Sequence, residues 1–363
     1  MSVEDFSQLS FDFDYNEDDF NEETPQPEFD QGSEHPSYFG FGLEMPLDSE
    51  GDLIFPDEIL SDNLIQSSIS TVGPVINSFK HAFVKFEAPN QRLSDIDMLS
   101  QYIHLRNIDL SNNRIKDLVA LHPITFLQVL NVEGNQISSL AYISKLIYLQ
   151  TLNLSRNEIS ATTGFPSNKL TYLNLSRNKV SALENFRPDV FPNLLLLELR
   201  ENLITSLDGV SLPKLENLYV AGNQLQSLAG IENCPMLKVV HARHNMISHL
   251  PDFIKLPNLE YINLRNNVIH RFTEVLRLGS AKNLSAVILS SNPIAEDDRY
   301  RGEVIIACPA SLRRLDKFLI PEAEQAEALR YRRARENRTM EPVLDAAYST
   351  ASTPPDASRE YQV

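Results

Sequence analysis

A pattern of spaced leucines that ends in an asparagine recurs through the middle of this 363-residue chain and restricts its possible folds more than any other feature. The pattern is L-x-x-L-x-L-x-x-N-x-I/L, and its first copy runs from Leu105 to Ile115. Self-similarity at a fixed period of this length is typical of a solenoid, in which each unit contacts only its neighbours. Nine copies follow one another at intervals of 21 to 25 residues, with their asparagines at Asn113, Asn135, Asn157, Asn178, Asn202, Asn223, Asn245, Asn267 and Asn292.

The residue types of the pattern follow from what one unit must do. Each copy is predicted to form a short strand whose leucines point inward and pack on the preceding and following copies, because one copy cannot bury its own apolar face. The asparagine lies where the chain leaves the strand, and its amide can satisfy backbone groups that the turn leaves without partners. The predicted fold class is therefore α/β: a curved leucine-rich-repeat solenoid of about nine 22-residue repeats with terminal caps and disordered tails.

Both ends of the repeat array are predicted to be capped, since a solenoid otherwise exposes its apolar ends. Residues 80–98 keep an alternating apolar strand but lack the turn asparagine, which suits a terminal half-repeat. Residues 300–316 read YRGEVIIACPASLRRLD, and their apolar residues are expected to cover the other end: Val304, Ile305, Ile306, Leu312 and Leu315. The predicted domain is thus residues 80–316, preceded by an acidic tail (1–79) and followed by residues 317–363 as a helix and a second tail.

Charge is distributed very unevenly along the chain. Residues 1–79 contain 19 Asp and Glu and no Lys or Arg, whereas the remaining residues carry 32 basic and 30 acidic groups. One-sign charge together with Pro, Ser and Gly predicts disorder for residues 1–79. Aromatic residues are interleaved with the acids in FSQLSFDFDYNEDDF, so three roles are open: an entropic tail, a segment that folds on a partner, or one that folds back onto its own solenoid.

The C-terminal extension is predicted to begin with one exposed helix over residues 321–338. Pro321 suits a first helical position, and the order of acidic residues before five arginines complements the helix dipole. The arginines are interpreted either as a solvated face or as a contact for an acidic surface. From Thr339 onward, Pro, Ser and Ala predict disorder again.

No enzyme site, metal site or cofactor site is predicted. The sequence has no Gly-rich phosphate loop, no paired His at metal-ligand spacing and no G-x-S-x-G elbow. His241 and His244 are close in sequence but have no further ligand at suitable spacing. The two distant cysteines, Cys234 and Cys308, favour a reducing compartment, and no secretory signal or apolar span predicts contact with a membrane.

The concave face of the solenoid is the predicted docking surface. Three positions of each copy point to this face, because side chains alternate along a strand. They are the residue just before the second leucine of the pattern, the residue just after it, and the residue two positions further along the chain. Aromatic residues and arginines, the types most often found as interface hot spots, gather there in copies five to eight, so we expect an acidic partner. The alternative is that these columns simply carry β-favouring residues. The candidate binding residues are Tyr172, Leu196, Arg200, Tyr219, Val239, His241, Arg243, Tyr261 and Arg265.

Four segments carry a resemblance to a known family. HAFVKFEAPNQRLSDIDMLSQYIHLRNIDLSNNRIKDL (81–118), LPKLENLYVAGNQL (212–225), LEYINLRNN (259–267) and YRGEVIIACPASLRRLDK (300–317) resemble the leucine-rich repeat-containing protein 23 family. The resemblance implies a non-catalytic scaffold in the radial spokes of motile cilia and sperm flagella, bound to other axonemal or spoke proteins. It also implies localisation to the cytoplasm, the cytoskeleton and the axoneme of a cilium or flagellum. It transfers no residue-level function, because the matching motifs are those that build the solenoid.

Two other functions remain open from the sequence. The repeat period also suits a regulatory subunit that holds a protein phosphatase through its concave face. An RNA-protein assembly factor is the second alternative, although the acidity of residues 1–79 argues against nucleic acid as a partner.

Overall fold

The structure is a computed structural model that describes residues 57–75, 79–164 and 169–338, with the side chains described as far as residue 334. The chain divides into one unit of residues 1–58 and a second from Ile59 onward. Nearly all of the first unit lies outside the described residues, as do the disorder predictions for residues 1–56 and for residues from Thr339 onward. The fold described below is that of the second unit.

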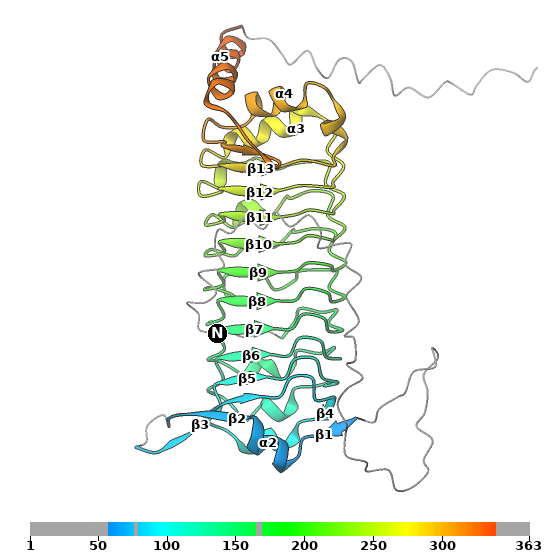
Figure 1. Cartoon of the computed structure of the whole chain (residues 1–363), viewed down its shortest axis with the longest axis vertical. Helices are drawn as coiled ribbons and strands as arrows, with labels where there is room; N and C mark the ends of the chain where they lie inside the picture. Colours follow the sequence, from blue (N-terminus) through cyan, green and yellow to red (C-terminus); the bar gives the residue numbers. More distant parts are fainter. Residues whose placement is uncertain (1–56, 76–78, 165–168, 339–363) are drawn as a thin grey trace, which may run out of the picture. The chain divides into compact units, whose positions relative to one another are not determined.

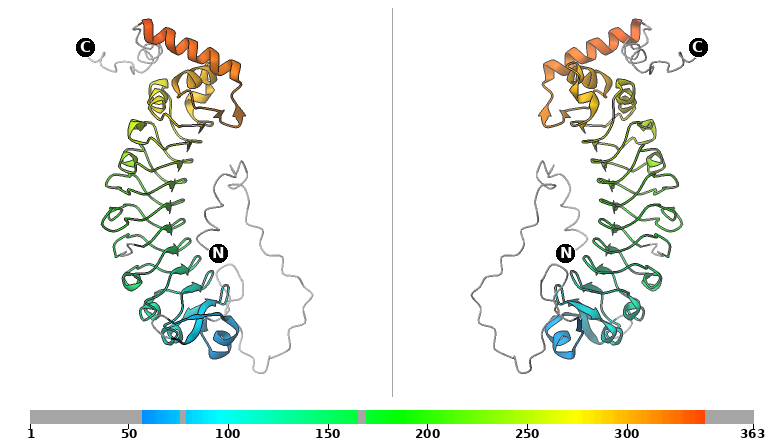
Figure 2. Two further views of the ribbon diagram at one scale, coloured as in Figure 1. Left: turned by 90° about the vertical axis from the view of Figure 1, so that its left-hand side faces the viewer. Right: turned by 90° about the vertical axis from the view of Figure 1, so that its right-hand side faces the viewer.

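The second unit is a solenoid built on one sheet of 13 described strands. Its repeats stack into a curved column with the strands on the concave side (Figure 2). Eleven of the strands run parallel in sequence order (Figure 1): β3 (His81–Glu87), β5 (Asn107–Asp109), β6 (Val129–Asn131), β7 (Thr151–Asn153), β8 (Tyr172–Asn174), β9 (Leu196–Glu198), β10 (Asn217–Tyr219), β11 (Val239–His241), β12 (Tyr261–Asn263), β13 (Ala286–Ile288) and β14 (Arg314–Leu315). At the two ends, β2 (Ile69–Pro74) and β15 (Phe318–Leu319) pair antiparallel to β3 and β14.

Helical structure is short and lies between the strands or at the ends of the column. Three α-helices belong to the caps: α2 (Asp62–Ser68), α4 (Tyr300–Ala307) and α5 (Glu322–Arg338). A fourth, α3 (Phe272–Leu276), lies in the last full repeat. Short 3₁₀ helices lie in several of the connections: η1 (Asp97–Gln101), η2 (Val119–Leu121), η3 (Ile143–Lys145), η4 (Ile231–Asn233), η5 (Phe253–Lys255), η6 (Arg277–Ser280) and η7 (Pro293–Glu296).

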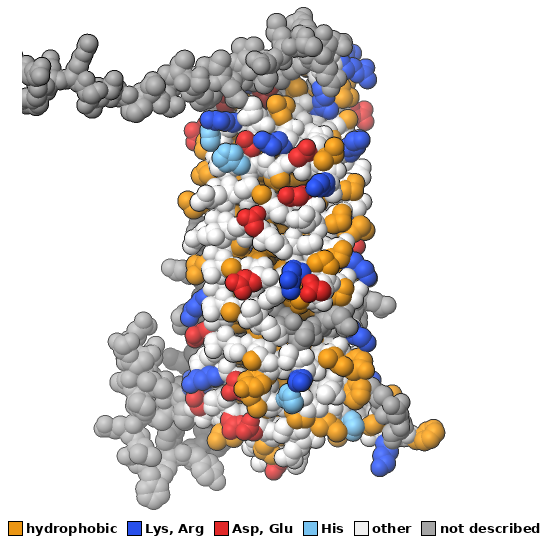
Figure 3. All heavy atoms as spheres, turned by 180° about the vertical axis from the view of Figure 1, so that it is seen from behind, with side chains coloured by type: hydrophobic (Ala, Val, Ile, Leu, Met, Phe, Trp, Pro, Cys, Tyr) orange, Lys and Arg blue, Asp and Glu red, His pale blue; other side chains and the backbone are white. Residues whose placement is uncertain are grey.

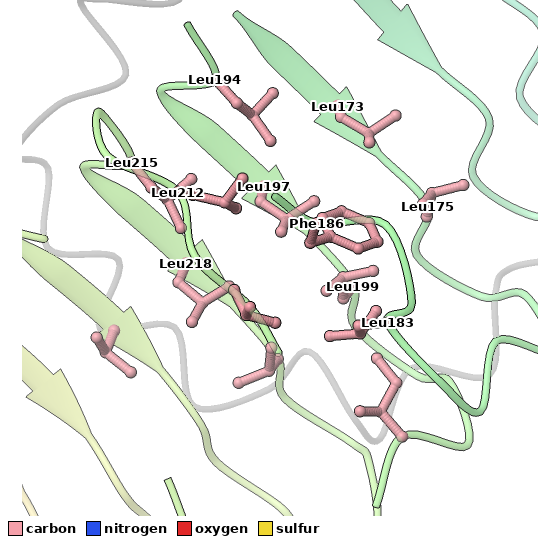
Figure 4. Packing of buried hydrophobic residues seen from close by; sticks show 14 of the residues in the cluster. Leu173, Leu175, Leu183, Phe186, Leu194, Leu197, Leu199, Leu212, Leu215 and Leu218 are labelled. Atoms are coloured by element: carbon pink, nitrogen blue, oxygen red, sulfur yellow. The ribbon is translucent and has the colours of Figure 1, made fainter. Parts of the chain in front are cut away.

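The core is a continuous stack of aliphatic residues. The central residue of each short strand is buried, and successive central residues are in register, as Leu197 of β9 pairs with Leu173 of β8 and with Leu218 of β10. Figure 4 shows these leucines pointing into the same interior as Phe186, which comes from the connection between β8 and β9. The prediction of a leucine-rich-repeat solenoid is confirmed.

The turn asparagines form the predicted buried ladder. The side-chain amide of Asn135 donates to the carbonyl oxygens of Val132 in its own repeat and of Leu110 in the preceding one, at 3.0 Å each. Its Oδ1 accepts from the backbone N–H of Ile115 at 3.0 Å. The same set of bonds recurs at Asn223, which uses Val220, Leu199 and Ile204. Each asparagine therefore joins two repeats as well as closing its own turn.

The N-terminal cap begins earlier than the sequence analysis predicted. Residues 57–75, assigned there to the acidic tail, include β1 (Glu58–Ile59), α2 and β2, and they bury Leu60 and Ile65 against the core. Ser61 caps α2, and β2 covers the otherwise open edge of β3. The predicted boundary was wrong because the charge was averaged over residues 1–79, whereas residues 63–79 carry no charged side chain.

The C-terminal cap confirms the predicted helix but not its predicted exposure. Val304, Ile305, Leu312 and Leu315 are buried in the cap as expected, whereas Ile306 is only partly buried. The helix α5 packs on α4, and its Ala328 is buried. Two arginines hold α5 against α4. Arg301 on α4 forms an ion pair with Glu324 through two hydrogen bonds, and Arg332 on α5 donates to backbone carbonyl oxygens at the end of α4.

Candidate protein-binding face

The register of the sheet brings the predicted binding residues together in columns on the concave face. Tyr172, Leu196, Val239 and Tyr261 all occupy the first position of their strands, and the pairing of β8 to β12 aligns these positions. Tyr219 and His241 end neighbouring strands and pair directly. The arginines lie two residues beyond the strand ends: Arg200, Arg243 and Arg265.

Four of these residues form one continuous stack, which we call the concave stack. The guanidinium of Arg200 lies 4.6 Å from the ring centroid of Tyr219. The rings of Tyr219 and His241 are 4.7 Å apart at 16°, and those of His241 and Tyr261 are 4.9 Å apart at 38°. Four successive repeats therefore contribute one side chain each to the stack.

Glu198 orders the start of the concave stack, and the sequence analysis did not select it. The hydroxyl of Tyr172 donates to one carboxylate oxygen of Glu198 at 3.0 Å, and Arg200 lies 3.8 Å from the other. Burial, followed by the charge of Glu198, raises the pKa of Tyr172 well above its ordinary value. The only sign of this role in the sequence was the position of Glu198 between two columns of selected residues. No sequence pattern distinguished it from a glutamate that is simply exposed to solvent.

The histidines beside the arginines are held uncharged. Burial, followed by the charges of Arg200 and Arg243, lowers the pKa of His241 to about 3. The pKa of His244 is also lowered, first by burial and then by Arg243 and Arg265. Positive charge on this part of the face therefore comes from arginine alone, which keeps its proton at any physiological pH.

The candidate residues differ in how much surface they present. Tyr261 is only 9% exposed, so its ring mainly supports His241. Four other candidates are half-buried: Leu196, Val239, Arg243 and Arg265. The accessible part of the face is therefore the arginines, the edges of Tyr219 and His241, and two aliphatic side chains.

The convex side of the molecule has a different character. Seen from behind, it carries acidic and basic side chains scattered among uncharged ones, with neither sign gathered in one area (Figure 3). The grouping of arginines with aromatic rings is thus a feature of the concave stack and its neighbours.

Three further features of the described residues concern metal ligands, cysteines and apolar helices. Within residues 57–75, 79–164 and 169–338, no three His, Cys, Asp or Glu side chains lie close enough to hold a metal ion. Cys234 and Cys308 are buried and free, and burial raises their thiol pKa values to about 11 and about 12. Of the helices described, none combines the length and the apolar character needed to cross a membrane.

Family models for leucine-rich repeats match most of the solenoid. A model described as "Leucine-rich repeat" matches residues 208–343, and one described as "Leucine Rich repeats (2 copies)" matches residues 103–148. A single-repeat model matches residues 145–162 and 167–182.

Curated relatives are similar over most of their length. The chain is 38% identical over 310 residues to leucine-rich repeat-containing protein 23 of Xenopus tropicalis, which covers 79% of this chain and 82% of the relative. The protein of the same name from Bos taurus is 35% identical over 270 residues, covering 74% and 78%. The Homo sapiens protein is 34% identical over 330 residues, covering 78% and 82%.

Solved structures share the fold. An internalin (inlF) from Listeria monocytogenes superposes with a TM-score of 0.53 at 23% identity, over 63% of this chain and 66% of that one. A structure of a TLR13–ssRNA13 complex gives a TM-score of 0.50 at 27% identity, over 68% of this chain and 36% of that one. At 23% identity, the likeness to the internalin concerns the fold alone.

Proposed function

Because this chain belongs to the leucine-rich repeat-containing protein 23 family, we propose that it is a non-catalytic scaffold of the radial spoke in motile cilia and sperm flagella. There it binds other spoke proteins and helps to hold them in place. Two observations support the proposal besides the family resemblance. Arginine and aromatic side chains gather on the concave face, and no group of three His, Cys, Asp or Glu side chains among the residues described could hold a metal ion.

The observation that carries the docking role is the concave stack. Arg200, Tyr219, His241 and Tyr261 already contact one another in the chain without a partner. A preordered surface loses less conformational entropy on binding than a flexible one, and aromatic and arginine side chains supply most hot spots at interfaces. The stack therefore combines low ordering cost with the residue types that bind tightly.

The partner surface is proposed to be acidic. Arg243 and Arg265 follow neighbouring strands, which are about 4.8 Å apart in a sheet. Burial, followed by the charges of Arg243 and Arg265, lowers the pKa of His244, so both arginines contribute positive potential at this imidazole. A carboxylate brought by a partner would relieve the repulsion between the two arginines and add charge-assisted hydrogen bonds.

The test is proximity labelling in a ciliated or sperm-forming cell with two variants of the whole chain. One carries Tyr219→Ala, Arg243→Glu and Arg265→Glu, which leaves the buried Tyr261 in place. The control carries Lys116→Glu and Lys255→Glu, two exposed lysines away from the concave stack.

We expect spoke proteins to dominate the labelling by the native chain and by the control, and to be lost with the first variant. Persistence of spoke proteins with the first variant would mean that the docking face lies elsewhere. Dominance of phosphatase catalytic subunits or of splicing components in the native sample would overturn the spoke assignment itself.

A further inference from the structure

A second ladder of side chains lies on the flank of the solenoid where the parallel strands begin. Its members stand three residues before the first residue of their strands. The rings of Phe126 and Tyr148 stack at 5.4 Å and 29°, and the Nζ of Lys169 lies 4.4 Å from the ring centroid of Tyr148. These residues precede β6, β7 and β8, so the flank is ordered across three repeats.

A shallow hollow of about 400 Å³ opens beside Lys169. Lys169 and Lys214 line it from two sides, and Leu195, which is 38% exposed, lines it between them. The Nζ of Lys214 donates to Oδ1 of Asn193 at 2.6 Å, which fixes the direction of this lysine. An apolar side chain thus lies in a hollow bordered by two positive charges.

The charge around the hollow is not balanced by acidic neighbours. Across the described part of the chain, neither Lys169 nor Lys214 forms an ion pair with a carboxylate. Glu216, which directly precedes β10, is already paired with Lys238 at 2.8 Å. The flank therefore presents positive charge together with an exposed leucine, and both features are complementary to an acidic segment that carries an apolar residue.

We infer that this flank is a second docking surface, and that its occupant is an extended acidic protein segment with an apolar side chain between two acidic residues. Lys169 and Lys214 precede β8 and β10, which are two strand spacings apart, or about 10 Å. An extended segment advances about 3.3 Å per residue and its side chains alternate between two faces, so acidic residues four positions apart face the same side, about 13 Å from each other, where the long lysine side chains can reach them. A residue between them then reaches Leu195.

The flank and the arginines of the candidate binding face lie at opposite ends of the strands. The flank residues precede the strands, whereas Arg200, Arg243 and Arg265 follow them. Two partners can therefore be held at once, which makes the chain a link between proteins as well as a platform for one. This inference does not depend on the spoke assignment.

The experiment measures binding of a short fluorescein-labelled peptide to the full chain by fluorescence anisotropy. In the peptide, one Phe lies midway between two Glu that are four positions apart, so that all three side chains face the same side of an extended segment. A second peptide has Gln in place of both Glu. The flank variant carries Lys169→Glu and Lys214→Glu, and Leu195→Ser is made separately to remove the apolar contact while both lysines stay. The Lys116→Glu, Lys255→Glu control makes the same change of charge elsewhere.

We expect the flank variant to raise the Kd of the Glu peptide at least about tenfold, and Leu195→Ser to raise it by a smaller factor. The control variant should change the Kd less than about twofold. The Gln peptide should bind at least about tenfold more weakly to the native chain. Unchanged thermal unfolding of each variant by circular dichroism shows that the fold is intact.

Three results would overturn the inference. Equal weakening by the flank and control variants would show a general effect of net charge. Loss of binding with Tyr219→Ala, Arg243→Glu and Arg265→Glu, but not with the flank variant, would place the peptide on the concave stack. Equal affinity for the Gln peptide would remove the charge argument.

Discussion

The imidazole of His241 lies parallel to the ring of Tyr219, 4.7 Å away on the neighbouring strand, and its pKa is lowered to about 3. Burial among the stacked rings lowers the pKa of His241 most, because it shields the imidazole from water. The charges of Arg200 and Arg243 lower it further, because they oppose another positive charge. The imidazole of His241 on the concave face therefore stays uncharged across the physiological pH range.

The low pKa of His241 makes folding stability depend on pH. The unfolded chain binds a proton on this residue below its ordinary pKa of 6.5, whereas the folded chain does not until about pH 3. Stability contributed by the neutral imidazole is thus fully present above pH 6.5 and is lost as the pH falls from 6.5 towards 3. We expect a loss of roughly 3 kcal/mol between pH 7 and pH 4 that His241→Phe abolishes. Urea unfolding at a series of pH values checks this, and an unchanged pH slope in the variant would contradict it.

The turn asparagines should contribute far more to folding stability than the amide side chains of neighbouring residues. In Asn223→Ala, the buried N–H of Ile204 loses its partner, and the buried carbonyl oxygens of Leu199 and Val220 each lose one of two donors, keeping Asn202 and Asn245 respectively. We expect the free energy of unfolding to fall by about 2 to 4 kcal/mol, because unpaired buried polar groups are costly. The neighbouring Gln224 is exposed, so Gln224→Ala should cost less than about 0.5 kcal/mol. Denaturant unfolding of both variants provides the comparison, and equal losses would refute it.

Arg332 should hold α5 against α4. It donates to the carbonyl oxygens of Ile306, Ile305 and Cys308, at the end where a helix attracts a positive charge. We expect Arg332→Ala to cost about 1 to 3 kcal/mol locally and to speed hydrogen exchange in α5. The adjacent Arg333 is exposed, and Arg333→Ala serves as the matched control. Exchange rates in α5 that match between the two variants would argue against this role.

The N-terminal cap should be needed for a stable solenoid. A chain that begins at Asp57 keeps β1, α2 and β2, whereas one that begins at Lys80 exposes the edge of β3 and loses the buried Leu60 and Ile65. Each of these side chains contributes about 1.5 to 3 kcal/mol on burial, so we expect a clearly lower Tm and aggregation for the shorter chain only. Thermal unfolding and size-exclusion chromatography test this, and equal Tm values would mean that the cap is dispensable.

The sequence alone was sufficient for the solenoid and for the columns of its concave face. Each repeat packs only on its neighbours, so the contacts that build the core are written in a local pattern, as at Leu173, Leu197 and Leu218. Side chains alternate along a strand, so Tyr219 and His241 could be placed on one face before any coordinates existed. The turn role of the asparagines followed from the same repeat.

Only the tertiary structure shows the contacts between side chains whose spacing in the sequence follows no period. Side-chain rotamers and connections of unequal length between strands determine three such features. They are the contact of Glu198 with Arg200, the contact of Arg332 with the end of α4, and the hollow at Leu195. The cap of residues 57–75 was hidden for a related reason. A strand that pairs once, at the edge of a sheet, leaves no repeat in the sequence, and its uncharged residues were masked by the acidity of the residues before them.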